Sequence, residues 1–269
     1  MSGPAAQRER PDAIEIHPTA IVDPNASLGS GVQIGPWAMI GPNVRIGSGT
    51  QVGPSAMVER NTTIGEDCRI HKGAVLGTDP QDLKFREEET ELFVGDRTVV
   101  REYATLNRGT SASGRTVVGN DCLLMAYTHV AHDCLLGDHV ILSNAVNMAG
   151  HVELQDWVIV GGLTPIHQFV KVGAHAFVGG GSRLSQDVPP FCRVAGSPAK
   201  LYGLNSVGLE RRGFTQAARS ELKQAYRIMF QSQLNISQGL RRAREELDPG
   251  DAVETFLSFI ERSERGITT

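Results

Sequence analysis

The sequence predicts a mainly β protein, a parallel β-helix of hexapeptide repeats followed by a C-terminal α-helical domain. Two observations predict the β-helix: a large aliphatic residue returns at every sixth position, and a small residue follows it four positions later. A third predicts the helical domain, because the repeat ends near residue 190 and apolar residues then recur at the spacing of helices.

The repeating unit of six, here called a hexad, begins at Ile16 and ends at Leu184. Of the 29 positions reached by steps of six, 26 hold a large aliphatic residue, and the exceptions are Asp82, Glu88 and Ala112. An α-helix repeats every 3.6 residues and an isolated strand every 2, so neither produces this pattern. Short strands joined by corners do produce it. Three such sides, one hexad each, make one coil, and we expect the coils to stack as parallel strands over residues 14–195.

Cysteines take part in the same pattern. Cys68, Cys122 and Cys134 all occupy the small position that follows an aliphatic residue, as Ala20 and Ala38 do. No pair has CxxC spacing, which argues against a zinc or redox motif. We therefore expect these thiols to pack inside the coil as small apolar groups.

Two departures from the repeat define the remaining organisation. Residues 77–93 are polar and interrupt the pattern, yet the pattern returns in phase, which favours a loop projecting from the scaffold over a tolerated surface insertion. Helical patterns occupy residues 215–231, 237–247 and 251–263, so residues 196–269 should form a helical domain over the open end of the coil. For the N-terminal extension, residues 1–13, we expect disorder.

Composition excludes several classes of function. The chain has 269 residues and a formal net charge of −4, so it lacks the bulk positive charge that holds nucleic acid. It shows neither a signal-peptide core nor an apolar segment of membrane-spanning length. We expect a soluble, cytoplasmic protein.

Polar residues of the repeat should gather at one edge of the coil. Positions three hexads apart lie above one another, about 4.8 Å apart in paired strands, so His132 aligns with Gly150 and Gln168. Asp133 aligns with His151 in the next column. The expected cluster comprises His129, His132, Asp133, Gly150, His151, His167 and Gln168.

Three interpretations of this cluster compete. In the first, His132 is a general base, because an imidazole with an unperturbed pKa of about 6.5 suits proton abstraction at neutral pH. Asp133 would then fix its tautomer, and the Gly150 N–H would stabilise an oxyanion. In the second, three histidines bind a catalytic zinc ion. In the third, the side chains are merely exposed at coil corners.

Five motifs carry a resemblance to a known family. They are "DPQDLKF", "HVAHDC", "AGHVEL", "IHQFVKVGAHAFVGGGS" and "LNSVGLERRGF". Together they resemble the UDP-N-acetylglucosamine O-acyltransferases over residues 14–265. The resemblance implies a left-handed parallel β-helix with C-terminal helices, assembled as a homotrimer with active sites between subunits. It implies transfer of a 3-hydroxyacyl chain from acyl carrier protein to the 3-hydroxyl of UDP-N-acetylglucosamine, the first step of lipid A synthesis. The donor chain is carried on phosphopantetheine, and no resident cofactor is expected.

The resemblance also implies residue roles. His132 would be the general base, Asp133 would orient it, and the Gly150 amide would contact the oxyanion. The residues matching substrate-binding positions are Asp82, Lys84, His129, His151, His167, Gln168, Asn205, Arg211 and Arg212.

Two further positions bear on specificity. Val207 stands where the family often has an acidic residue, which puts one nucleotide contact in doubt. Gly180 matches the position that limits acyl length, and a glycine there would favour a long chain of around 14 carbons. Gly180 follows His132 by eight hexads, which is two coils and two further sides, so it should lie on a different side of the prism. A trimer could bring the two together from adjacent chains.

Other functions remain open at this point. An acetyl-CoA-dependent acetyltransferase of this scaffold would lack the "DPQDLK" loop and the long helical domain. A γ-type carbonic anhydrase would bind zinc, typically with two histidines five apart, whereas His129 and His132 are three apart. A non-enzymatic scaffold or sugar-nucleotide sensor would bind without turnover, and an acyltransferase could use a 3-amino sugar instead.

Overall fold

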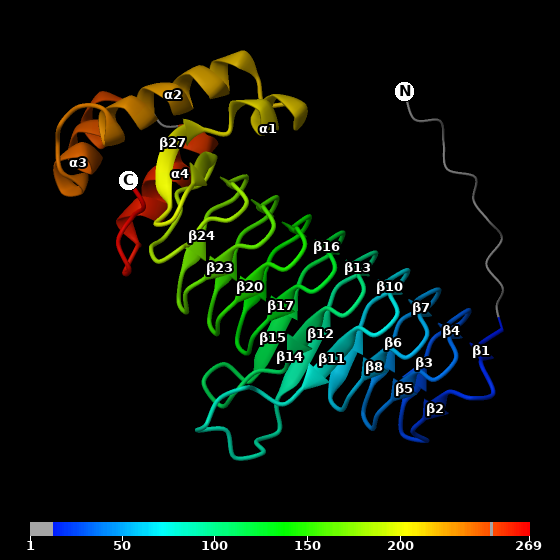
Figure 1. Cartoon of the computed structure of the whole chain (residues 1–269). Helices are drawn as coiled ribbons and strands as arrows, with labels where there is room; N and C mark the ends of the chain where they lie inside the picture. Colours follow the sequence, from blue (N-terminus) through cyan, green and yellow to red (C-terminus); the bar gives the residue numbers. More distant parts are fainter. Residues whose placement is uncertain (1–12, 248–249) are drawn as a thin grey trace.

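The computed structural model describes residues 13–247 and 250–269, and its main part is a three-sided prism of stacked coils (Figure 1). Each side is a sheet of short parallel strands, except that β26 and β27, at the end of the first sheet, pair antiparallel. The first sheet contains β1 (Glu15–Ile16), β4 (Gln33–Ile34), β7 (Gln51–Val52), β10 (Arg69–Ile70), β13 (Val99–Val100), β16 (Leu123–Leu124), β19 (Ile141–Leu142), β22 (Ile159–Val160) and β25 (Phe177–Val178), then β26 (Cys192–Ala195) and β27 (Lys200–Leu204).

The other two sheets contain eight strands each. The second sheet contains β2 (Ile21–Val22), β5 (Met39–Ile40), β8 (Met57–Val58), β11 (Val75–Thr78), β14 (Thr105–Asn107), β17 (His129–Val130), β20 (Asn147–Met148) and β23 (Pro165–Ile166). The third contains β3 (Ser27–Leu28), β6 (Arg45–Ile46), β9 (Thr62–Ile64), β12 (Glu91–Val94), β15 (Arg115–Val118), β18 (Leu135–Leu136), β21 (Glu153–Leu154) and β24 (Lys171–Val172).

Aliphatic residues of the repeat fill the interior, as predicted. Every one of them from Ile34 to Leu184 is buried. Ile16 is 46% exposed because it belongs to the first coil, which has no coil beneath it. Outside the insertions, the small positions from Val32 onward are buried as well, and burial raises the pKa of the Cys134 thiol to about 12. The three cysteines of the repeat are therefore packing residues, as expected.

The expectation that every coil contains three hexads is wrong at two places. Ile34 pairs with Val52, three hexads further along the chain, but Ile64 pairs with Val94, five hexads further. Val94 in turn pairs with Val118, four hexads further. The chain therefore carries one insertion of two hexads and another of a single hexad. Because both insertions are whole hexads, the aliphatic phase survives and conceals them.

These insertions form two loops that leave the same region of the prism (Figure 1). The first covers residues 79–90, shorter at both ends than the predicted 77–93, because β11 continues to Thr78 and β12 begins at Glu91. The second covers residues 108–114 and was not predicted. Its only trace in the sequence is Ala112, at a position that otherwise holds a large aliphatic residue.

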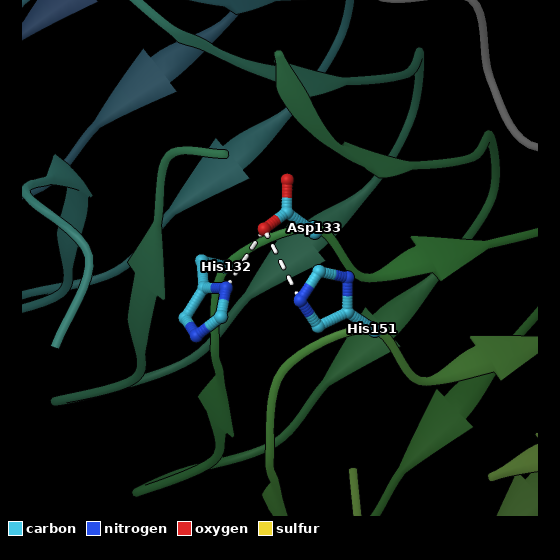
Figure 2. A group of neighbouring side chains, drawn as sticks. All are labelled: His132, Asp133 and His151. Carbon is cyan, nitrogen blue, oxygen red and sulfur yellow. Dashed lines mark hydrogen bonds and ion pairs between the residues drawn. The ribbon is translucent and has the colours of Figure 1, made fainter. Parts of the chain in front are cut away.

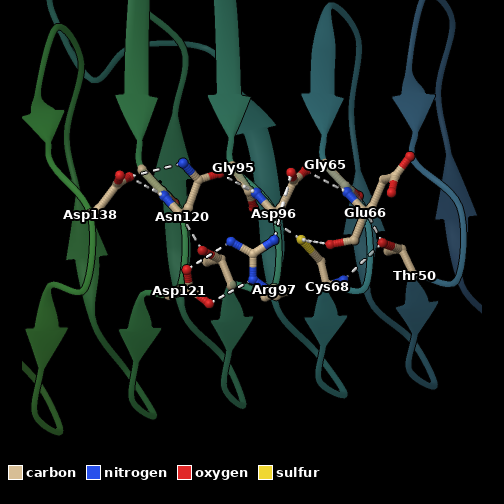
Figure 3. A network of polar contacts seen from close by, with 12 residues as sticks. Thr50, Gly65, Glu66, Cys68, Gly95, Asp96, Arg97, Asn120, Asp121 and Asp138 are labelled. Atoms are coloured by element: carbon tan, nitrogen blue, oxygen red, sulfur yellow. Dashed lines mark hydrogen bonds and ion pairs between the residues drawn. The ribbon is translucent and has the colours of Figure 1, made fainter. Parts of the chain in front are cut away.

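One corner of the prism is held by a ladder of side chains that cap the coil below (Figure 3). Asp138 Oδ1 accepts the Asn120 N–H at 2.7 Å, and Asn120 Oδ1 accepts the Asp96 N–H at 2.8 Å. Asp96 Oδ1 accepts the Glu66 N–H at 2.8 Å. A glycine precedes each of these residues, since a larger side chain would clash with the ladder. At Gly65, for example, a Cβ would lie 2.2 Å from Asp96 Oδ1. The ladder satisfies backbone groups that the corner would otherwise leave unpaired.

Helices cover the C-terminal end of the prism (Figure 1). They are α1 (Ser206–Arg211), α2 (Gln216–Phe230), α3 (Ile236–Glu246) and α4 (Asp251–Glu261). The last three lie where the sequence predicts them, whereas α1 was not predicted. Thr215 caps α2, and Asn235 forms a capping box with Gln238 on α3. A second hydrophobic cluster, which includes Leu222 and Phe256, joins these helices to the end of the coil.

The expectation of disorder for residues 1–13 falls outside the described residues, apart from residue 13. Among the described residues, no helix is both long enough and apolar enough to cross a membrane.

Candidate active site

Asp133 is a buried carboxylate at the corner that follows β17. Its backbone lies in the left-handed region, with φ 59°, so the turn brings its side chain back beside the ring of His132. The side chain is fully buried. It accepts hydrogen bonds from the Thr110 N–H at 3.0 Å, the Thr110 hydroxyl at 2.7 Å and the Ser113 hydroxyl. Although desolvation opposes ionisation, the donors of Ser113, His132 and Thr110 prevail and lower the Asp133 pKa to about 2.

This ionised carboxylate decides the tautomer of His132. His132 Nδ1 lies 2.8 Å from Asp133 Oδ2 (Figure 2). An ionised carboxylate can only accept hydrogen bonds, so Nδ1 must carry the proton and donate it. In the neutral ring, Nε2 then carries the free lone pair. His132 also lines a groove, so this lone pair is available to a substrate hydroxyl.

Gly150 lies directly against that ring, as the spacing of three hexads predicts. A Cβ built on Gly150 would lie 2.5 Å from His132 Cε1 and 2.7 Å from His132 Nε2. No side chain fits there without moving the imidazole. The Gly150 N–H donates to no acceptor within residues 13–247 and 250–269, so it is free to bind a developing negative charge.

The groove in front of His132 has a volume of about 520 Å³ and lies along the second sheet. It is lined by Gln81, Thr105, His129, Ala131, His132, Asn147, Met148, Ala149, Gly150 and Gln168. Its floor is the outer face of β14, β17 and β20, and Gln81 from the first loop forms part of one side.

The neighbouring histidines have separate environments. His129 Nδ1 is 2.7 Å from the Thr105 hydroxyl, and desolvation followed by the proximity of His132 lowers the His129 pKa, which favours its neutral form. His151 Nε2 is 3.7 Å from Asp133 Oδ2 (Figure 2). The His151 ring stacks on Phe169.

His167 is not part of this groove. It is exposed, its Nδ1 lies 3.1 Å from the Gln168 carbonyl, and only Gln168 of the pair lines the groove. The structure thus brings His129, His132, Gly150 and Gln168 to one groove, with Asp133 behind it.

The predicted substrate residues of the first loop lie apart from the groove lining in this chain. Asp82 Oδ1 accepts the Lys84 N–H at 2.9 Å, which shapes the loop, while the Lys84 side chain is exposed. Leu83 between them is 97% exposed. Gln81 is therefore the one loop residue that reaches the groove, and the sequence analysis did not single it out.

Two of the three predicted nucleotide residues, Asn205 and Arg211, line a second concavity at the helical end of the prism. It has a volume of about 400 Å³ and is lined by Ile159, Phe177, Arg193, Leu204, Asn205, Ser206, Val207, Gly208 and Arg211. Asn205 is buried, accepts the Gly208 N–H at 3.2 Å and donates to the His175 carbonyl at 3.0 Å. Val207 is 60% exposed beside it.

Arg212 points elsewhere. Its guanidinium lies 5.2 Å from the Trp157 ring centroid and donates to the Trp157 carbonyl at 3.0 Å. Desolvation lowers the Arg212 pKa. Gly180 lines neither concavity; it follows β25 of the first sheet and lies against Gly161 and Gly162.

Several residues of the site were not predicted from the sequence. Thr110, Ser113 and Thr105 contact Asp133 or His129 from distant parts of the sequence, because the second insertion changes the register there. Thr105 pairs with His129 and lies four hexads before it, so comparing residues four hexads apart instead of three would have identified Thr105. No sequence signal places Thr110 and Ser113.

A metal ion at this centre would meet a carboxylate that is already committed. His132, Asp133 and His151 are the described residues whose potential ligand atoms lie close together. A cation there would displace the hydrogen bonds between Asp133 and its donors, which occupy both carboxylate oxygens. The arrangement matches a carboxylate that orients a histidine better than it matches a vacant ligand set.

Comparisons with known proteins identify the family of this chain. The family model for domain 2 of UDP N-acetylglucosamine O-acyltransferase matches residues 187–268, and the bacterial transferase hexapeptide model matches residues 13–48, 43–78 and 115–150. An acyl-[acyl-carrier-protein]–UDP-N-acetylglucosamine O-acyltransferase of Chlorobaculum parvum is 57% identical over 252 residues, which cover 93% of this chain and 96% of the relative. The chain belongs to the UDP-N-acetylglucosamine O-acyltransferase family.

Solved structures of this family share the fold. LpxA from Acinetobacter baumannii superposes with a TM-score of 0.92 at 41% identity, covering 94% of this chain and 99% of that one. LpxA from Bacteroides fragilis gives 0.92 at 40% identity, covering 94% and 100%. The left-handed parallel β-helix with C-terminal helices is confirmed, and the chain is an acyltransferase.

Proposed function

We propose that this acyltransferase moves a 3-hydroxyacyl chain from the thioester of acyl carrier protein to the 3-hydroxyl of UDP-N-acetylglucosamine, the first step of lipid A synthesis. Relatives named for acyl-[acyl-carrier-protein] and UDP-N-acetylglucosamine support both substrates. The observation that carries the proposal is the contact of His132 with Asp133 on one side and Gly150 on the other, at the wall of a groove.

The first step is attack on the thioester. His132 Nε2 takes the proton of the sugar 3-hydroxyl while Asp133 stabilises the imidazolium that forms. The sugar oxygen forms a bond to the thioester carbon, and the carbonyl oxygen becomes an oxyanion. The free N–H of Gly150 donates to this oxyanion, a contact worth about 10²–10³ in rate for one donor.

The second step is collapse of the tetrahedral intermediate. The carbon–sulfur bond breaks, the carbonyl re-forms, and the phosphopantetheine sulfur leaves as a thiolate that takes the proton from His132. The enzyme returns to its starting protonation state and needs no cofactor of its own. The same sequence of steps would serve a 3-amino sugar, so the acceptor atom is part of the test.

Nucleotide binding is proposed for the second concavity. Arg193 and Arg211 place two positive charges beside the apolar surfaces of Ile159 and Phe177, which suits a base followed by phosphates. Asn205 supplies polar groups there, while Val207 replaces an acidic contact with an apolar one. Arg212 is held over Trp157 and does not line this concavity, so we assign nucleotide binding to Asn205 and Arg211.

A homotrimer is proposed as the active form. Leu83 at the tip of the first loop and Leu163 at a corner of the coil are 97% and 73% exposed, which suits burial against another subunit. Asp82, Lys84 and Gly180, none of which lines the groove of their own chain, could then serve the groove of a neighbour. His151 and His167 would flank the substrate as it enters, in a cytoplasmic enzyme.

Product analysis tests the proposal most directly. The protein would be incubated with UDP-N-acetylglucosamine, its 3-amino analogue and acyl carrier proteins that carry 3-hydroxyacyl chains of different length. Mass spectrometry should find the O-acylated sugar nucleotide, with a long chain preferred. Acylation of the amino sugar alone would overturn the acceptor, and binding without product would overturn the reaction.

A further inference from the structure

Residues 108–114, the second loop, contact both Asp133 behind His132 and Asp79 at the start of the first loop. They leave the second sheet after β14 and enter the third sheet at β15, beside the first loop (Figure 1). The inserted hexad is not needed by the coil, whose other turns close without it. Its side chains make contacts in two directions.

One end of the second loop holds the carboxylate behind His132. The Thr110 N–H and hydroxyl donate to the two oxygens of Asp133, and Thr110 is almost fully buried. The Ser113 hydroxyl contacts Asp133 Oδ1 and can also reach the Arg115 carbonyl at 2.9 Å. The ionised carboxylate is the stronger acceptor of the two.

The other end holds the base of the first loop. Arg108 is 1% exposed, and its guanidinium forms an ion pair with Asp79, the first residue of that loop. Asn107 donates to the Asp79 carbonyl at 3.0 Å and to the Thr78 hydroxyl at 2.6 Å, and the Arg108 N–H donates to the Thr78 carbonyl at 3.0 Å.

We infer that the second loop is a positioning element that ties the carboxylate behind His132 to the base of the first loop. Asp79 precedes Gln81, which lines the groove of its own chain, and Asp82, which the proposed function assigns to the groove of a neighbouring subunit. One short stretch of backbone thus sets the base and the substrate loop relative to each other. The inference rests on the proposed function.

Burial explains why both contacts should be decisive. A fully buried guanidinium must keep its partner, because an unpaired buried charge is strongly unfavourable, so Arg108 holds Asp79 in one place. The Thr110 and Ser113 hydroxyls and His132 Nδ1 all donate hydrogen bonds to Asp133, so each of them offsets part of its negative charge. Removing the two hydroxyls leaves more of that charge to His132, whose other charged or titratable neighbours are His129 and His151.

The first arm of the test removes the hydroxyls with little change in shape. In Thr110→Val and Ser113→Ala, kcat should fall about 3- to 10-fold, and the acidic limb of the kcat/KM profile should move up by roughly 0.5–1 pH unit. KM for the sugar nucleotide should stay within about twofold, since the loop anchor is intact. Thr110→Ser keeps the hydroxyl and should restore the profile. Nitrogen-15 NMR of the His132 ring gives a readout without turnover: the Nδ1–H tautomer should become more dominant in both hydroxyl deletions, because more of the Asp133 charge then faces Nδ1.

The second arm removes the loop anchor. Asp79→Asn should raise KM for UDP-N-acetylglucosamine about 5- to 20-fold, with kcat within about twofold and the acidic limb unmoved. Arg60→Gln is the matched control, because Arg60 also pairs with Asp79, at 3.2 Å, but is itself 46% exposed. An exposed ion pair contributes little, so KM in this control should stay within about twofold.

The outcomes separate the two claims. A wild-type protein that fails to acylate UDP-N-acetylglucosamine overturns the proposed function. If the wild type is active, and Thr110→Val and Ser113→Ala lose rate without any change in the acidic limb or in the His132 tautomer, the loop has a purely structural role. That result overturns the inference. So does an Asp79→Asn variant whose KM equals that of Arg60→Gln.

Discussion

Gly150→Ala tests the centre of the proposed mechanism with one methyl group. The Gly150 φ is outside the left-handed region, so its backbone accepts alanine without strain. The obstacle is the His132 ring, because the new Cβ would lie 2.5 Å from Cε1. Ordinary contact is about 3.5 Å, so the ring or the corner must move by roughly 1 Å.

That displacement sets the expected magnitudes. Overpacking of this size costs about 1–3 kcal/mol of unfolding free energy. A misplacement of about 1 Å at a catalytic group costs on the order of 10² in rate, and loss of a general base costs about 10²–10⁴. We expect kcat/KM to fall about 10²- to 10³-fold while the β-helix stays folded.

The assay combines steady-state acyl transfer with urea unfolding. Gly239→Ala in the helical domain is the control, because its Cβ would meet the flexible Met229 Sδ at 3.3 Å and the Met229 Cα at an ordinary 3.5 Å. Its activity should equal wild type. In the His132→Ala background the clash is absent, so adding Gly150→Ala should cost much less stability than it does alone. An active Gly150→Ala enzyme, or a stability cost that is equal in both backgrounds, would refute the reasoning.

Three further substitutions extend the test. His132→Ala should lower kcat/KM by about 10³-fold or more and change the unfolding free energy by less than about 1 kcal/mol, because the ring lies at a groove wall; retained turnover would exclude it as the base. Desolvation, aided by Arg212, lowers the His175 pKa to about 4, and its buried Nδ1 has no partner among the described residues. The folded state therefore binds fewer protons than the unfolded state, and stability should be full above pH 6.5 and fall by about 3 kcal/mol as pH falls to 4. In urea titrations, His175→Phe should remove this contribution to the loss of stability at low pH, and an unchanged pH dependence would contradict the assignment to His175. Phenylalanine can adopt the left-handed backbone of His175, φ 59°, because Phe191 has φ 63°. Gly180→Met should shift donor preference to shorter acyl chains in a competition assay, and an unchanged chain-length profile would make the ruler assignment wrong.

Much of the fold could be predicted because each coil repeats the same local demand. An aliphatic residue at position 34, 52 or 70 faces the same interior, so one period of six identifies the sheets, the core and the role of the cysteines. Gly150 beneath His132 followed from the same register, since no insertion separates them. The short helix α1 could not be predicted, because a single turn with one buried residue, Leu209, leaves no periodic signal.

The register failed where the insertions are themselves whole hexads. Residues 108–114 shift the pairing of His129 to Thr105, four hexads back instead of three, without disturbing the aliphatic phase. The donors to Asp133 are therefore invisible to an argument from spacing. Asp79 and Arg108 are similarly far apart in sequence, and each alone looks like an ordinary surface charge.

The sequence by itself determined the repeating scaffold, the side of the coil on which the histidines lie, and the adjacency of His132 and Asp133 to a glycine one coil away. These follow from local periodicity, because every turn of the coil imposes the same constraint on the next. Only the tertiary structure decided that Asp133 is ionised and fully bonded, and that the second loop contacts both Asp133 and Asp79. Those features depend on side chains brought together by insertions, where burial and hydrogen bonding act across segments that no local pattern relates.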